Sequence, residues 1–276
     1  VALTALFIGL AGTLLGEPFA QFDFVNRGQT WLPLFALMVG AFFGALDDFL
    51  EITKSRGGLS LRYRLCVVAV LAGFIGWWFY AKLGVAAVGI PFIGALQLGW
   101  LFVPFFILVM LALYAGGIID GIDGLAGGVF AFIFMAYAGI AFAQNQIALA
   151  AFAASVAGAL FAFLWFNIPP ARFYLSETGT MALTVALVVT AFSADVLGEG
   201  VGVFVLPIIA LPLTVTVLTS MAQVFSKKVF KKKLFRIAPI HHHFEAIGWP
   251  AYKVTMRYWV ITIIAGIFGL ALALLK

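Results

Sequence analysis

The sequence predicts an all-α membrane protein whose chain crosses the bilayer several times. Of its 276 residues, 64% are hydrophobic and only 10% are charged, which is more apolar surface than a soluble core of this size needs. The apolar residues are gathered in repeated runs of roughly 17–25 residues, the length at which a helix spans the hydrocarbon core. Because that core offers no water to backbone groups, each run is expected to form a helix.

We predict nine membrane-spanning helices within one integral-membrane domain that covers residues 1–276. Their expected ranges are 1–16, 31–46, 62–83, 98–116, 127–143, 147–166, 181–195, 203–225 and 257–275. The chain starts at Val1, without methionine or a recognisable signal peptide, so we expect further sequence upstream. The connections then alternate between two sides of the membrane, and one side receives the loops 47–61, 117–126, 167–180 and 226–256.

The basic residues predict which side is cytoplasmic. Among 16 Lys and Arg residues, only Arg27, Lys82 and Lys276 lie away from the four loops named above. Cytoplasmic loops carry an excess of Lys and Arg, so we assign the four loops to the cytoplasm. Nucleic-acid binding is a poor explanation of this charge, because the basic clusters flank spans. The single cysteine, Cys66, excludes an internal disulfide and a multi-cysteine metal site.

Two adjacent carboxylates, Asp47 and Asp48, stand at the end of the second predicted span. Neighbouring carboxylates raise each other's pKa unless a cation lies between them. Mg²⁺ is commonly bound by one or two carboxylates together with phosphate oxygens. The pair therefore indicates a metal or phosphate site, and the alternative is an ordinary solvated helix end.

The next loop contains Asp120-Gly121-Ile122-Asp123-Gly124, in which two aspartates are three residues apart and flanked by glycine. Glycine permits a positive φ and lets a ligand approach the backbone closely. The alternative is a tight turn between two spans, which Asp-Gly steps form readily.

The third loop combines Asn167, Arg172, Tyr174 and Glu177 after two prolines that end the preceding span. Its Ser and Thr residues could cap the following helix, whose N-terminus would then face a phosphate. The alternative is a helix cap without any further function.

All three histidines stand side by side, as His241, His242 and His243, after a run of lysines. Three adjacent imidazoles cannot share one face of a helix or strand, so we predict a functional loop here. The alternative is a solvated surface loop. Acids, histidines and basic residues on one membrane side together suit the handling of a diphosphate with a metal ion.

Four motifs in this order resemble the polyprenyl-phosphate N-acetylhexosamine-1-phosphate transferases. They are the Asp-Asp pair, Asp-Gly-Ile-Asp-Gly-Leu-Ala, the Asn…Glu-Thr-Gly loop and Pro-Ile-His-His-His-Phe-Glu. The last motif is most similar to that of the bacterial phospho-N-acetylmuramoyl-pentapeptide transferases. The family fold has ten transmembrane helices, so the nine predicted spans match its helices two to ten.

The resemblance implies a reaction of peptidoglycan synthesis at the cytoplasmic face of the bacterial inner membrane. Phospho-MurNAc-pentapeptide passes from UDP-MurNAc-pentapeptide to undecaprenyl phosphate, which gives lipid I and UMP and requires Mg²⁺. The family also suggests a homodimer in the lipid bilayer. Two alternatives stay open: a sister enzyme that transfers another UDP-HexNAc phosphate, and a non-catalytic scaffold or transporter.

Matching positions imply the individual roles. Glu177, which stands where the family has an aspartate, and Asp120 would bind the metal. Asp47 and Asp48 would orient the lipid phosphate, one of them serving as a possible base, and the three histidines would position the donor. The substrate-binding residues implied by the resemblance are Asp123, Asn167, Tyr174, Gly121, Gly124 and Lys54.

Overall fold

The computed structural model describes residues 30–53, 58–196 and 200–275, together with positions 7, 10, 11 and 14–16. In these ranges the chain is almost entirely helical, and two short strands form its only sheet. The long helices confirm the predicted all-α, multi-pass membrane class. The α-helices are α2 (Trp31–Thr53), α3 (Leu61–Lys82), α4 (Phe102–Gly116), α5 (Leu125–Ala143), α6 (Ile147–Asn167), α7 (Ser176–Val196), α8 (Gly202–Ile209), α9 (Leu211–Val229), α10 (Ile240–Ala246) and α11 (Ala251–Leu274).

Seven helical segments of the described ranges are long and apolar enough to cross a membrane, counting α4 together with the 3₁₀ turns on either side of it (Gly99–Ile119), and the bent pair α8 and α9 makes an eighth when it is counted as one span. The prediction of one continuous helix over 203–225 was wrong, because the two helices meet at an angle of 72°. Pro207 lies inside α8 and Pro212 lies in the first turn of α9. A proline has no N–H for the helical hydrogen bond and its ring obstructs the preceding turn, which explains the break. The predicted span 1–16 falls outside the described residues, apart from the scattered positions given above.

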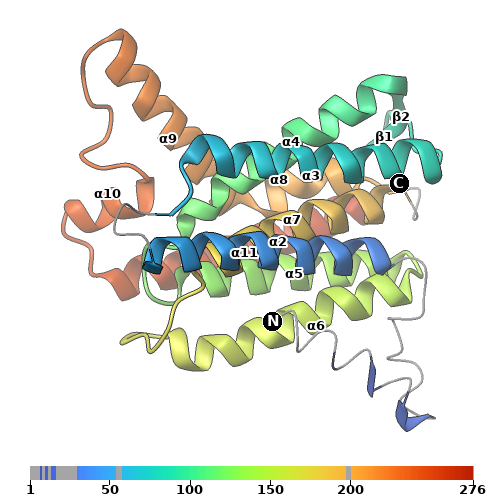
Figure 1. The fold of residues 1–276 in the computed structure, drawn as a ribbon, viewed down its shortest axis with the longest axis horizontal. Helices are drawn as coiled ribbons and strands as arrows, with labels where there is room; N and C mark the ends of the chain where they lie inside the picture. The colour runs from blue at the N-terminus through green and yellow to red at the C-terminus, as the bar shows by residue number, and fades with distance from the viewer. Residues whose placement is uncertain are drawn as a thin grey trace.

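The helices run side by side, so that the predicted motifs gather at one end of the bundle (Figure 1). We call this end, formed by residues 47–53, 58–61, 117–126, 167–176 and 230–250, the motif end. At the opposite end lie the end of α11 and an antiparallel hairpin of β1 (Ala87–Ile90) and β2 (Gly94–Gln97). Helix α9 projects away from the bundle beside the motif end.

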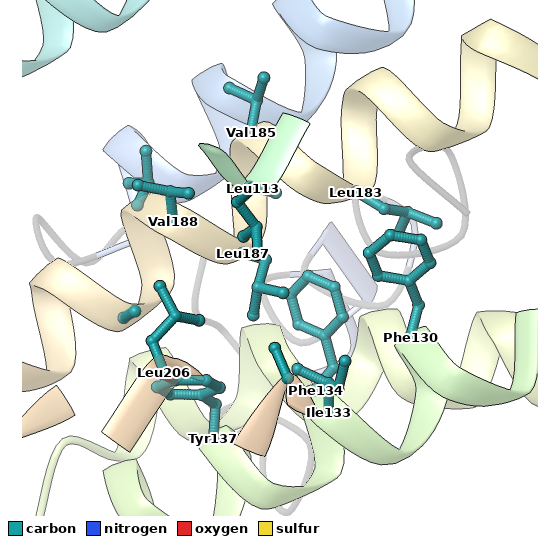
Figure 2. Close-up of a cluster of buried hydrophobic side chains, with 14 of the residues drawn as sticks. Leu113, Phe130, Ile133, Phe134, Tyr137, Leu183, Val185, Leu187, Val188 and Leu206 are labelled. Atoms are coloured by element: carbon teal, nitrogen blue, oxygen red, sulfur yellow. The ribbon is translucent and has the colours of Figure 1, made fainter. Parts of the chain in front are cut away.

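Helix α7 forms the centre of the bundle. It packs against α2, α4, α5 and α8, and its hydrophobic residues from Met181 to Ala194 are almost completely buried. Figure 2 shows Leu183 and Leu187 of this helix directed toward the aromatic rings of α5. Because α7 begins in the motif end, a rigidly packed α7 fixes the position of its own first turn there.

Two glycines allow α2 to lie directly against α7. A Cβ atom on Gly44 would lie 2.3 Å from the carbonyl oxygen of Glu177, and one on Gly40 would lie 2.9 Å from the Cα of Ala182. Glycines four residues apart lie on the same helix face and permit this backbone approach in membrane helices. The contact brings the last two turns of α2, which carry Asp47 and Asp48, to the start of α7.

Replacing Gly44 with alanine is expected to lower the stability by about 1–3 kcal/mol, because the added methyl group must push two helix backbones apart. Gly158 on α6 provides a matched control, since nothing lies within 4 Å of a Cβ built there. Thermal unfolding of both variants in the same detergent measures the difference. An unchanged midpoint for Gly44→Ala would contradict the close packing of α2 on α7.

Candidate functional site

The carboxylate of Asp48 caps the N-terminus of α7 from another helix. Its Oδ2 accepts hydrogen bonds from the backbone N–H of Thr178 at 3.0 Å and from the hydroxyls of Ser176 and Thr178 at 2.5 Å each. Its Oδ1 accepts from the backbone N–H of Glu177 at 3.2 Å. The first N–H groups of a helix have no partner within that helix, so this carboxylate satisfies them and binds α2 to α7.

Arg64 bridges the carboxylates of Asp47 and Glu177. Its Nε lies 2.8 Å from Oδ2 of Asp47, and its Nη1 lies 2.5 Å from Oε1 of Glu177. Asp47 is fully buried and also accepts a hydrogen bond from the backbone N–H of Leu59, while Tyr114 donates its hydroxyl to Oε2 of Glu177 at 3.3 Å. One guanidinium therefore holds together side chains from α2, α3 and α7.

Asp120 lies beside the same helix start. Its Oδ2 accepts a hydrogen bond from the backbone N–H of Ser176 at 3.1 Å. Burial raises the pKa of Asp120 to about 6, against the effect of that hydrogen bond, and the negative charges of Glu177, Asp123 and Asp48 raise it further. These carboxylates thus concentrate negative charge at one place, where a cation would be stabilised.

The second and third predicted loops are hydrogen-bonded to each other. Asp123 accepts from the backbone N–H of Ala171 at 3.0 Å. The buried amide of Asn167 accepts from Gly124 N–H at 3.0 Å and donates to the carbonyl of Phe173 at 2.8 Å. In this structure Asn167 joins two loops of the site, and its predicted contact with substrate stays a prediction.

The three histidines lie on the short helix α10, so the prediction of a loop was wrong at this point. We had argued that one helix face cannot hold three adjacent imidazoles. In the structure the three imidazoles do lie on one helix, but they point in different directions from it. The backbone of Gly121 lies against two of them: a Cβ there would meet Nε2 of His242 at 2.6 Å and Nε2 of His241 at 3.0 Å. Only glycine lets the loop approach the histidine helix this closely.

His241 and His242 share this contact but differ in their environment. His241 is fully buried, and neither of its ring nitrogens has a hydrogen-bond partner in the described parts of the chain. Burial, and to a smaller degree the neighbouring His242, lowers the pKa of His241 to about 4. Its imidazole is therefore neutral near pH 7. His242 is half-exposed and pairs through Nδ1 with Oε2 of Glu245 at 2.7 Å.

His243 is turned toward the basic segment that precedes α10. Its Nδ1 accepts a hydrogen bond from the backbone N–H of Arg236 at 3.2 Å, and its ring meets that of Phe235 edge to face. The predicted histidine site is thus divided between two imidazoles that contact the Gly121 loop and one that holds the chain leading into α10.

Two predicted substrate-binding residues remain to be placed. The side chain of Tyr174 is 65% exposed at the motif end, where its ring is free to stack on a planar base. Lys54 lies outside the described residues.

The acids of the site fit a magnesium ion that takes most of its ligands from substrate phosphate and water. Within the described ranges, no three His, Cys, Asp or Glu side chains converge as a complete metal site. Mg²⁺ usually needs only one or two carboxylates and completes its octahedron with phosphate and water. Asp120 suits this role, since burial and the neighbouring carboxylates raise its pKa and a bound cation would stabilise its ionised form. Glu177 would have to exchange a contact with Arg64 or Tyr114 to become a second ligand.

Sequence reasoning missed four residues that assemble the site. In the sequence analysis Arg64 was counted only among the basic residues that indicate the cytoplasmic side. An arginine at the start of the span that follows the Asp-Asp pair could have suggested an ion pair with these carboxylates. Tyr114 gave no signal within its apolar run. On α11, Thr255 donates to the carbonyl of Asp123 at 3.1 Å and Trp259 to that of Gly124 at 3.0 Å, which fixes the Asp-Gly loop from a third helix.

Comparison with known proteins shows the family of this chain. Glycosyl transferase family 4 matches residues 30–195, from the start of α2 to the end of α7. The phospho-N-acetylmuramoyl-pentapeptide-transferase of Chloroflexus aurantiacus is 33% identical over 274 residues, covering 92% of this chain and 72% of the relative. The transferases of that name from Clostridium perfringens and Pelagibacter ubique are 32% and 33% identical, covering 86% and 90% of this chain and 73% of each relative. The chain therefore belongs to glycosyl transferase family 4, among the membrane phospho-sugar transferases that resemble the phospho-N-acetylmuramoyl-pentapeptide transferases.

Proposed function

We propose that the chain transfers phospho-MurNAc-pentapeptide from UDP-MurNAc-pentapeptide to undecaprenyl phosphate and releases UMP. The observation that carries this proposal is the convergence of four distant motifs. Asp48 and Asp120 both bind the start of α7, and Gly121 lies against His241 and His242. A site that combines acids able to hold a cation with imidazoles suits a substrate that carries a diphosphate.

The chemistry is an exchange of one phosphorus–oxygen bond for another. An oxygen of the lipid phosphate attacks the sugar-bound phosphorus of the donor, and the bond to the bridging oxygen breaks, so that this oxygen leaves with UMP. The attacking phosphate is already anionic near pH 7, so the protein's main tasks are positioning and charge neutralisation. A base is needed only for acceptor molecules whose phosphate still carries a proton.

A cation is needed because both substrates and the site are negatively charged. Five carboxylates gather here, and in the described part of the chain Arg64 is the one arginine or lysine that forms an ion pair with any of them. The ion that we propose is Mg²⁺, which would stabilise charge on the diphosphate. Asp120 would hold it, with Glu177 as a second ligand. Asp47 and Asp48 would orient the acceptor phosphate, with one of them as a possible base.

The remaining groups of the donor would be bound around this centre. Tyr174 offers an exposed ring for uracil, and Asp123 is hydrogen-bonded to Ala171 in the loop that carries this ring. His241 and His242 would contact the sugar-phosphate end, because their Nε2 atoms lie at the Gly121 backbone. A neutral imidazole can donate or accept there, and a protonated one adds charge.

An apolar cavity of about 630 Å³ offers a place for the polyprenyl chain of the acceptor. It lies between α4, the bent pair α8 and α9, and the hairpin, and its lining is almost wholly hydrophobic. The cavity extends along α4 to Leu113, which directly precedes Tyr114, the partner of Glu177. A lipid tail in this cavity would thus bring its phosphate toward the acids.

The cellular setting follows from the same proposal. The basic residues favour a cytoplasmic motif end, as the positive-inside rule requires. UDP-linked donors are made in the cytoplasm, so we infer a bacterial cytoplasmic membrane with the active site on its inner face. A homodimer is inferred only from the family resemblance.

Purified protein in lipid nanodiscs is expected to form lipid I and UMP from the two substrates when Mg²⁺ is present. Removal of Mg²⁺ with EDTA should stop the reaction, and added Mg²⁺ should restore it, since the substrates otherwise repel the acids. Radiolabelled donor and lipid extraction measure the product. A parallel assay with UDP-GlcNAc tests the sister activity: transfer from this donor alone would contradict the proposed substrate.

A further inference from the structure

A buried glutamine on α9 holds the segment that leads to the histidine helix. The side chain of Gln223 is 3% exposed, and its three hydrogen bonds are all directed at one short stretch of backbone. Its Oε1 accepts from the N–H groups of Leu234 and Phe235 at 2.9 Å each, and its Nε2 donates to the carbonyl of Phe235 at 3.0 Å. Three bonds to two adjacent residues fix both the position and the direction of that backbone.

The residue that follows this stretch holds α10 at two points. The backbone N–H of Arg236 donates to Nδ1 of His243, and its Nη1 donates to the carbonyl of Ala246 at 3.0 Å. The edge-to-face contact between Phe235 and His243 adds an apolar link at the same place. A continuous series of contacts therefore runs from Gln223 through residues 234–236 to the middle and the C-terminal end of the histidine helix.

We propose that Gln223 is a positioning residue that sets the orientation of α10 and thereby the placement of His241 and His242 against the Gly121 loop. The hydrogen bond from Arg236 also means that neutral His243 carries its proton on Nε2, because Nδ1 is an acceptor. Helix α10 has only seven residues and makes few hydrogen bonds of its own, so its orientation must be supplied from outside. The proposal has a catalytic part, an effect on the transfer rate, which rests on the proposed function. It also has a mechanical part, the fixed position of residues 234–236 and α10, which does not.

The mechanical part is tested by limited trypsin digestion of the full chain. Lys231, Lys232, Lys233 and Arg236 are exposed, but cleavage requires the surrounding backbone to open. Gln223→Leu removes all three hydrogen bonds and should speed cleavage after these residues by at least about tenfold. Thr219→Val is the matched control, because Thr219 lies one turn earlier on α9 and bonds only to its own helix, at Val215 and Thr216.

The catalytic part is tested by a double-mutant cycle with His243→Ala. If Gln223 acts through the segment that His243 binds, Gln223→Leu and His243→Ala should each lower transfer by about tenfold or more, and the double variant should be hardly worse than either. Gln223→Glu keeps the two acceptor bonds, and it should recover part of the rate at lower pH, where a protonated carboxyl can donate to the Phe235 carbonyl. A general loss of folding would instead make the two effects multiply and would not be rescued by glutamate.

The outcomes separate the two parts. Unchanged trypsin cleavage in Gln223→Leu would overturn the proposal, as would multiplying effects in the double variant. If the unmodified protein transfers no phospho-sugar, the proposed function fails, and the cleavage comparison still decides whether Gln223 holds the segment.

Discussion

Asp120→Asn is expected to slow transfer by about 10²–10⁴-fold without unfolding the protein. The carboxylate lies where burial and three other acids already concentrate negative charge, so it is the best candidate to bind a cation beside the diphosphate. Asparagine can still accept the hydrogen bond from the Ser176 N–H through its amide oxygen. The loss should therefore reflect the missing charge and not a missing contact. Initial rates over a series of Mg²⁺ concentrations measure it.

Asp195→Asn is the matched control for this experiment. Asp195 is also a buried carboxylate that accepts from a backbone N–H, that of Gly89 at 3.1 Å, but it lies at the opposite end of α7 beside the hairpin. Its replacement should leave transfer near the unmodified rate. Equal losses in the two variants, or a fully active Asp120→Asn protein, would contradict the assignment of Asp120 to the active centre.

Arg64→Met is expected to lower the stability by about 3–5 kcal/mol, because it leaves the buried carboxylate of Asp47 without its counter-ion. Asp47 is fully buried and its Oδ2 faces the guanidinium, while Glu177 lies against the same group from α7. Methionine keeps much of the side-chain volume, so the charge is the main change. The effect is measured as the midpoint of thermal unfolding in detergent, with size-exclusion chromatography to monitor the loss of folded protein.

Two further variants decide whether charge is the cause. Arg62→Met removes an exposed arginine from the same helical turn and should change the midpoint little. Adding Asp47→Asn to Arg64→Met should recover part of the lost stability, since one uncompensated charge is then removed. A double variant no more stable than Arg64→Met alone would indicate that the arginine acts by packing and not by charge.

The helical membrane class could be predicted from hydropathy because each apolar run has to satisfy its backbone hydrogen bonds by itself. The prediction of one straight span over 203–225 failed because hydropathy indicates which residues are apolar and does not indicate where the helix axis changes direction. Pro207 and Pro212 were visible in the sequence, and they were the signal for the 72° bend between α8 and α9. A bend becomes stable only when neighbouring elements pack against it, which the apolar run does not record.

The sequence by itself determined which residues could perform the chemistry: the acid pairs, the Asp-Gly loop and the three adjacent histidines are recognisable from residue type and spacing. Only the tertiary structure decided their partners. Asp48 became the cap of α7, Arg64 became the link between Asp47 and Glu177, and the histidines separated into two site-facing imidazoles and one anchored by Arg236. These contacts join residues that can be more than a hundred positions apart. They depend on how whole helices pack, as at Gly44, so no local pattern in the chain encodes them.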